Sequence, residues 1–68
     1  MIKKGIISNK IGRFAEASLP DENYTVTAML PLAKSINEDD VHIGDKCAIA
    51  FFDSDYVNFA DGVIIAII

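Results

Sequence analysis

Two short apolar runs near the end of the chain constrain its fold more than any other feature. They span Cys47 to Phe52 and Val63 to Ile68, and a polar segment separates them. Neither run approaches the about 20 apolar residues that a membrane-spanning helix needs. Apolar runs of this length, bounded by turn residues, are typical of buried β-strands. We therefore expect strands over 46–53 and 62–68, each of them apolar on both faces.

Alternating residues predict a third strand from Tyr24 to Leu30. One of its faces would carry Tyr24, Val26, Ala28 and Leu30. The preceding segment, 19–23, holds a Pro-Asp turn signal of hairpin length, which places a partner strand over 12–18. A further strand is expected over 2–8, where Gly5 marks either a bulge or a close approach of two backbones.

One helical turn is expected between Ser35 and Asp40, because Glu38 follows Ser35 at the spacing of a capping box. No apolar stripe of helical period occurs elsewhere in the sequence. Five short strands with one helical interruption describe an all-β fold, a small and partly open barrel of the OB type. The whole chain, 1–68, would form this single domain.

A glycine and an aspartate stand side by side before each of the two apolar strands. Gly44 and Asp45 precede the first strand, and Asp61 and Gly62 open the second. Glycine tolerates a positive φ, and aspartate can accept hydrogen bonds from nearby backbone. We expect all four residues to form structural turns, and at least one of the two glycines to have a positive φ.

The thin core of so short a chain makes association the expected source of additional stability. A domain of this size buries only ~60% of the surface of its unfolded chain. A disulfide within one chain is excluded because Cys47 is the only cysteine. Since a strand has two faces, part of the last apolar strand must point outward. We expect a homo-oligomer or a constitutive partner, with an assembly surface formed by Phe59, Val63, Ile64, Ile65, Ile67 and Ile68.

The charge of the chain disfavours nucleic acid as a partner. The formal net charge is −4, and the basic residues are scattered: Lys3, Lys4, Lys10, Arg13, Lys34 and Lys46. Nucleic-acid binders draw much of their affinity from lysines and arginines that neutralise phosphates. The N-terminal residues contain no apolar run of signal-peptide length, and no stretch is long enough to span a membrane. We expect a cytoplasmic protein with no membrane partner.

Motifs for metal binding are incomplete in this sequence. Asp53, Asp55 and Asn58, with Asp61, resemble a calcium loop, but an EF-hand counted from Asp53 requires glycine at its sixth position and glutamate at its twelfth. Those positions hold Asn58 and Ile64. The acidic run 38–40 is interpreted as a solvated segment before a strand. No metal or other cofactor is expected.

Catalytic groups are equally sparse. His42 is the only histidine, so neither a histidine-pair metal site nor a Ser-His-Asp triad has a second imidazole to support it. Cys47 lies in an apolar run without the flanking cations that make a thiol reactive, and we expect it to be buried and inert. No phosphate-binding glycine loop is present. We expect no enzymatic activity.

Four segments together resemble a known family. They are GIIS near the start, LPDENYTVTAMLPLA in the middle, VHIGDKCAIAFF after it and ADGVIIAI at the end. The pattern is similar to that of small OB-type barrel proteins of tailed-phage and prophage tail modules, related to the N-terminal barrel of phage baseplate assembly protein V. The positions that carry the likeness are Leu30-Pro31, Ile43-Gly44-Asp45 and Asp61-Gly62.

This resemblance implies a structural, non-enzymatic component of a phage or prophage tail or baseplate. Its partners would be copies of itself or other tail proteins. It would be found in the bacterial cytoplasm during assembly and afterwards in the virion tail.

A second resemblance implies a different function. LPDENYTV followed by IGDKCAIAFFDSDY is also similar to bacterial translation initiation factor one, an OB-fold protein that binds the small ribosomal subunit. That family is rich in basic residues on its RNA face, whereas this chain is acidic. A face combining Lys10, Arg13, Phe14 and Tyr24 would favour nucleic acid. An apolar patch on the last strand would favour assembly instead.

Overall fold

The computed structural model describes residues 1–52 and 59–68, and most of these residues lie in strands of one antiparallel sheet. The strands are β1 (Ile2–Ile11), β2 (Phe14–Leu19), β3 (Thr25–Val26), β4 (Leu30–Pro31), β5 (Lys46–Phe51) and β6 (Gly62–Ile67). Two 3-10 turns are present, η1 (Pro20–Glu22) and η2 (Glu38–Asp40). No α-helix occurs in the described part of the chain.

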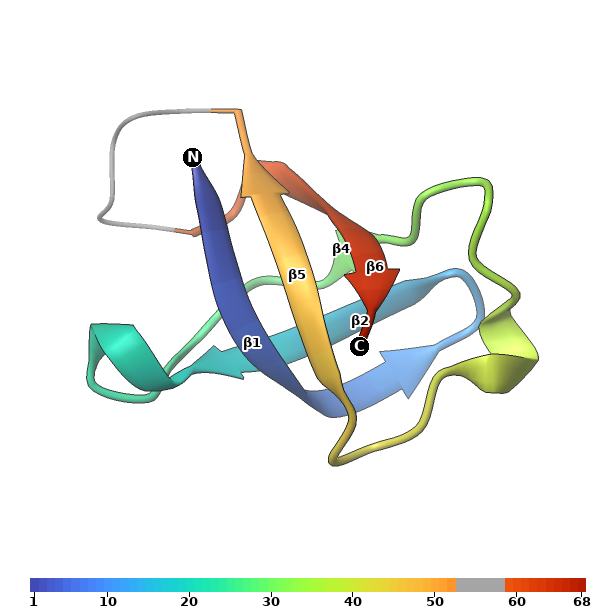
Figure 1. Ribbon diagram of the computed structural model, residues 1–68, viewed down its shortest axis with the longest axis horizontal. Coiled ribbons are helices and arrows are strands. Elements are labelled where there is room, and N and C mark those ends of the chain that lie inside the picture. Colours follow the sequence, from blue (N-terminus) through green and yellow to red (C-terminus); the bar gives the residue numbers. More distant parts are fainter. Residues whose placement is uncertain (53–58) are drawn as a thin grey trace.

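The strand order is β3-β2-β1-β5-β6, and β4 pairs separately with β2. Figure 1 shows that β1 is long and bent, so that its first half lies along β5 and its second half along β2. A register shift between Ile7 and Asn9 leaves Ser8 as an extra residue at this bend. Between β6 and the segment after β4, the only bridge is a parallel one from Leu32 to Ile64. The two ends of the sheet therefore meet at one point and not along a ladder.

The core lies between the two halves of the curved sheet, and alternate residues of the strands fill it. In β2 and β5 every second residue is buried, as the period of a strand requires. The buried apolar residues are Ile7, Ala15, Ala17, Leu19, Leu30, Leu32, Val41, Cys47, Ile49, Phe51, Phe59 and Ile64. The rings of Phe51 and Phe59 meet edge to face with centroids 5.3 Å apart.

Gly5 allows β1 to pass close to the core, where it meets side chains and not a second backbone. A methyl group at this position would lie 2.9 Å from Cδ1 of Ile49 and 3.0 Å from Cβ of Ala17. Real Cβ atoms essentially never approach a neighbour within 3.0 Å. Glycine is thus required here by packing, while the bulge of β1 lies at Ser8.

The first hairpin differs from the prediction in its boundaries. β1 continues to Ile11, three residues past the expected end, and β2 begins at Phe14 and not at position 12. Gly12 has φ +57 and forms the turn with Arg13. The expectation of a strand residue at Gly12 was wrong because a left-handed backbone conformation cannot continue a strand.

The strand expected over 24–30 is interrupted. β3 covers Thr25–Val26 and β4 covers Leu30–Pro31, and 27–29 form no strand. Thr27 is buried, and its hydroxyl accepts a hydrogen bond from the backbone N–H of Ala17 and donates one to the carbonyl of Ala28. A side chain that hydrogen-bonds to backbone competes with the ladder. Because the strand is broken here, its alternate residues do not share one face: Leu30 is buried, whereas Val26 and Ala28 are exposed.

The two predicted turn segments occur with changed details. The Pro-Asp segment forms η1, followed by two left-handed residues, Asn23 and Tyr24, each with φ 59. η2 is capped by Asn37, whose side chain accepts a hydrogen bond from the N–H of Asp39. Ser35 is not the cap, because the turn begins later than the capping-box spacing indicated.

Candidate assembly surface

The outer face of β1, β5 and β6 presents a row-by-row array of small and branched apolar side chains. Residues directly opposite each other on adjacent strands point to the same side of a sheet. The first row joins Ile2 to Ala50 and Val63, and the second joins Lys4 to Ala48 and Ala66. In Figure 1 these three strands lie in front of β2 and β4.

This face is the outer one because the alternate residues are buried. Gly5 and Ile7 of β1, Cys47 and Ile49 of β5 and Ile64 of β6 all point into the core. The third outward row pairs Ile6 with Lys46. Ile68 continues this row, because its N–H donates a hydrogen bond to the carbonyl of Lys46. We call this array the outer face: Ile2, Lys4, Ile6, Lys46, Ala48, Ala50, Val63, Ile65, Ala66 and Ile68.

A β-bulge in β6 changes which residues of the last strand point outward. Ile49 lies opposite Ile64 and Ala48 opposite Ala66, so Ile65 is an extra residue with no partner of its own on β5. Strict period-two alternation would place Val63, Ile65 and Ile67 on one face. The bulge breaks this grouping, because Ile64 and Ile67 both turn toward the core while Ile65 is exposed.

The predicted assembly residues fall into three groups. Phe59 and Ile64 are core residues, with exposed fractions of 6% and 0%. Ile67 is half-buried and packs against the core, and Val63 is half-buried in the outer face. Ile65 and Ile68 are exposed, at 38% and 77%. A partner of the folded chain can therefore contact most of Ile68, parts of Ile65 and Val63, and hardly any of Phe59 and Ile64.

Gly44 has φ +97, which confirms that one of the two glycines before the apolar strands has a positive φ. Its N–H donates to the carbonyl of Ile7, and the N–H of Ile7 donates to the carbonyl of Asp45. The carboxylate of Asp45 accepts the backbone N–H of His42 at 2.9 Å, closing the turn. This turn fixes the point at which β5 begins beside β1.

Gly62 is constrained by space and not by its backbone dihedral. A Cβ built there would lie 2.6 Å from the carbonyl oxygen of Ala50 and 2.9 Å from Cδ1 of Phe51. The preceding Asp61 accepts a hydrogen bond from the N–H of Phe52 through its carbonyl. Asp61 and Gly62 thus bring β6 close against β5 at the start of their ladder.

The four residues proposed for a nucleic-acid face do not all come together, because Lys10, Arg13 and Phe14 lie at the first hairpin and Tyr24 does not. Phe14 and Tyr24 lie near opposite ends of β2, because Phe14 begins that strand and Tyr24 donates its N–H to Leu19, which ends it. The guanidinium of Arg13 donates to the carbonyls of Ile36 (2.5 Å) and Ala33 (2.8 Å). Arg13 therefore holds a loop in place and does not present its charge to a phosphate.

A second exposed apolar row lies beyond the outer face, at the end of the first hairpin. Ile11 is paired with Phe14, and Phe14 with Pro31, and all three are exposed. The acidic turn η2 borders this row, since a Cβ built on Gly12 would lie 3.9 Å from Oε2 of Glu38. We call Ile11, Phe14, Pro31 and η2 the acidic end.

Cys47 is completely buried, as expected. Burial raises the pKa of its thiol from 9.0 to about 11, although a hydrogen bond from the backbone of Gly5 acts in the opposite direction and the charge of Asp45 adds to the rise. A neutral thiol is a poor nucleophile. At neutral pH this side chain is a packing group.

Other candidate chemistry is limited within residues 1–52 and 59–68. No three histidine, cysteine or acidic side chains there group closely enough to hold a metal ion. His42 lies 3.7 Å from the carboxylate of Asp45 and is exposed. Asp53, Asp55 and Asn58, the residues of the incomplete calcium motif, lie outside the described residues. None of the helical segments described is long and apolar enough to cross a membrane.

Comparison of the chain with protein-family models, with curated proteins and with solved structures found no match. The outer face is therefore identified from the geometry of this chain alone.

Sequence reasoning missed the part of the outer face that lies on β1 and β5. Ile2, Ala48 and Ala50 belong to it, although only the last strand was expected to contribute. A signal was present in β5, where alanines at 48 and 50 alternate with the larger Cys47, Ile49 and Phe51. Such alternation of small and large residues indicates a strand that buries only its larger side chains.

Proposed function

We propose that this chain is a structural, non-enzymatic assembly component of a phage or prophage tail or baseplate, acting by protein–protein association. The observation that carries the assembly function is the outer face. Its side chains are apolar except for Lys4 and Lys46, and Ile2 and Ile68 are 61% and 77% exposed. Contiguous exposed apolar surface on a folded chain is typical of an interaction site.

Association through this face would supply the stability that a thin core lacks. Covering a large aliphatic side chain contributes roughly 1.5–3 kcal/mol when it is fully exposed at first, before the costs of association are subtracted. Ile2, Ile65 and Ile68 together offer several such contributions. The alanines between them leave a flat surface against which another protein can pack closely.

We also propose that the fold is a five-stranded barrel of the OB type. In this interpretation β3 and β4 are two parts of one interrupted strand, split at Thr27. The strands then follow one another around a closed path through the parallel bridge between Leu32 and Ile64, supported by the hydrogen bond from the N–H of Ala33 to the carbonyl of Ile64. The tail or baseplate location is supported by the sequence resemblance carried by Leu30-Pro31, Ile43-Gly44-Asp45 and Asp61-Gly62.

Sedimentation velocity of the purified protein at micromolar concentration tests the proposed function. We expect wild type to associate and Ile65→Asp and Ile68→Asp to shift it to monomer. Val26→Asp is the matched control, because Val26 is 49% exposed on β3, at the other end of the strand order. If wild type is a monomer, and if no tail protein from a phage-producing culture binds it in a manner dependent on Ile65, the proposed function is wrong.

A further inference from the structure

We infer that the outer face binds a second copy of this chain, which presents its acidic end, so that copies associate head to tail. This inference rests on the proposed assembly function and specifies its partner. It is carried by the charges that accompany the two exposed apolar surfaces defined above, the outer face and the acidic end.

The outer face is basic. Its only charged side chains are those of Lys4 and Lys46, and they lie on neighbouring strands in adjacent rows. Neither forms an ion pair within the described residues, where the bridges join Lys3 to Glu22 and His42 to Asp45. The nearest acid in sequence, Asp45, has its carboxylate hydrogen-bonded to the backbone of His42. Asp61 lies beyond the first row, at the end of the face away from Lys46.

The remainder of the chain is strongly acidic. The formal net charge is −4, so excluding the two positive charges of Lys4 and Lys46 leaves −6 for all other residues. The rest of a second copy therefore has a net charge opposite to that of the outer face. Opposite potentials favour encounter and fix the orientation of partners.

A symmetric face-to-face dimer has the wrong charges. In such an interface the same patch meets itself. Four lysine side chains, two from each copy, would then share one interface whose rows contain no acidic side chain. Like charges placed opposite each other across an interface are strongly unfavourable. The partner surface must instead combine exposed apolar side chains with acids.

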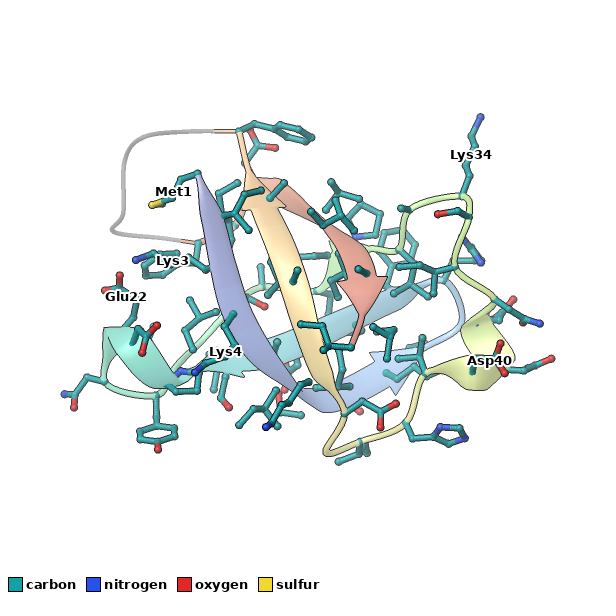
Figure 2. All side chains as sticks on the ribbon, viewed as in Figure 1. Met1, Lys3, Lys4, Glu22, Lys34 and Asp40 are labelled. Carbon is teal, nitrogen blue, oxygen red and sulfur yellow. The ribbon has the colours of Figure 1, made fainter. Side chains whose placement is uncertain are left out.

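The acidic end has both properties. Ile11 and Phe14 are 67% and 50% exposed, and Pro31 continues their row. Beside them η2 carries three consecutive acids, and the side chain of Asn37 holds the turn in place. The nearby cation Arg13 is directed to the carbonyls of 33 and 36. In Figure 2 Lys34 extends away from Asp40.

The two surfaces lie at different places on the molecule. Figure 2 shows Lys4 on the left of β1 and Asp40 at the right-hand end of the longest axis. One copy can therefore bind a second through its outer face and a third through its acidic end. Contacts of this kind produce a ring if the rotation closes and a filament if it does not.

A charge-reversal experiment tests this inference. The face variant is Lys4→Glu with Lys46→Glu, and the end variant is Glu38→Lys with Asp39→Lys. All four side chains are outside the core, so circular dichroism of each variant should match wild type. We expect each variant alone to associate more weakly than wild type, by a factor of about ten or more. An equimolar mixture of the two should recover association, because each reversed surface then meets a complementary one.

Salt provides a second measurement that needs no variant. Attraction between opposite charges is screened by salt, so head-to-tail association of wild type should weaken as ionic strength rises. Face-to-face association, which brings like charges together, should strengthen. If the end variant associates as wild type does, or if salt strengthens association, the head-to-tail inference is wrong while the assembly function stands. If wild type is monomeric, the head-to-tail inference is wrong, and the assembly function fails with it only if no tail protein binds the chain in a manner dependent on Ile65.

Discussion

Replacement of Gly62 by alanine should destabilise the chain severely, although alanine is the smallest possible change. The added methyl group would lie 2.6 Å from the carbonyl oxygen of Ala50 and 3.3 Å from Cα of Phe51. Both are backbone atoms of β5, and Phe51 is paired with Gly62 in the ladder. They cannot move away without separating β5 from β6.

The magnitude follows from the cost of forcing atoms into filled space. Overpacking costs about 1–3 kcal/mol, occasionally more, and a rigid backbone neighbour places Gly62→Ala near about 3 kcal/mol. In a domain of this size each 1 kcal/mol lowers the melting temperature by about 4–8 °C, so the expected fall is roughly 12–24 °C. Gly44→Ala is the matched control, because nothing lies within 4 Å of its added methyl group. Its cost, about 1–2 kcal/mol, comes only from the positive φ.

Urea denaturation followed by circular dichroism measures both variants, at a protein concentration low enough to keep the chain monomeric. Asparagine separates the two causes, since it tolerates left-handed backbone better than alanine. Gly44→Asn should recover part of the loss, whereas Gly62→Asn should be worse than Gly62→Ala. If Gly62→Ala lies within about 1 kcal/mol of wild type, the close approach of β6 to β5 is wrong.

Three further changes test other parts of the structure. Burial raises the pKa of the Cys47 thiol from 9.0 to about 11, so the neutral thiol contributes its full share to the free energy of unfolding below pH 9 and this share is lost as the pH rises through about 11. The alkaline loss of stability in thermal melts should therefore be smaller in Cys47→Ala than in wild type, and equal alkaline profiles of the two proteins would contradict this. Tyr24 combines φ 59 with 66% exposure, so Tyr24→Asn should raise the free energy of unfolding by about 1 kcal/mol, and a lower value would refute the strain. Arg13→Met removes two hydrogen bonds to loop carbonyls and should lower the free energy of unfolding by about 1–2 kcal/mol. The amide of Ile36 should also exchange faster with solvent, and an unchanged exchange rate would show that the guanidinium does not hold this loop.

Much of the sheet could be predicted from period and turn chemistry. Strands over 46–53 and 62–68, a turn over 19–23 and a positive φ at one of Gly44 and Gly62 were expected, because apolar runs and glycine-aspartate pairs act locally. β5, β6, η1 and the φ of Gly44 agree with these expectations apart from the exact ends of the strands. The break at Thr27 was not predictable, since it depends on a hydroxyl that reaches the backbone of Ala17 on another strand. Local pattern cannot show such a contact.

The assembly surface was predicted only in part for a similar reason. Period-two alternation puts Ile65 on one face with Ile67 and does not tell which face is outward, and one bulge residue reverses the rest of the strand. The contribution of Ile2 and Ala50 depends on which strands pair and in what register. Register is a property of the folded sheet, and no single segment of the sequence contains it.

Amide chemical shifts recorded over a dilution series of the wild-type protein test the central claim most directly. If copies associate head to tail, signals from two separate regions should move together with concentration. One region is the outer face around Ala48 and Ala66, and the other is the acidic end around Phe14 and Glu38. Spectra that do not change with dilution and report a monomer, or changes in only one of the two regions, would contradict the claim.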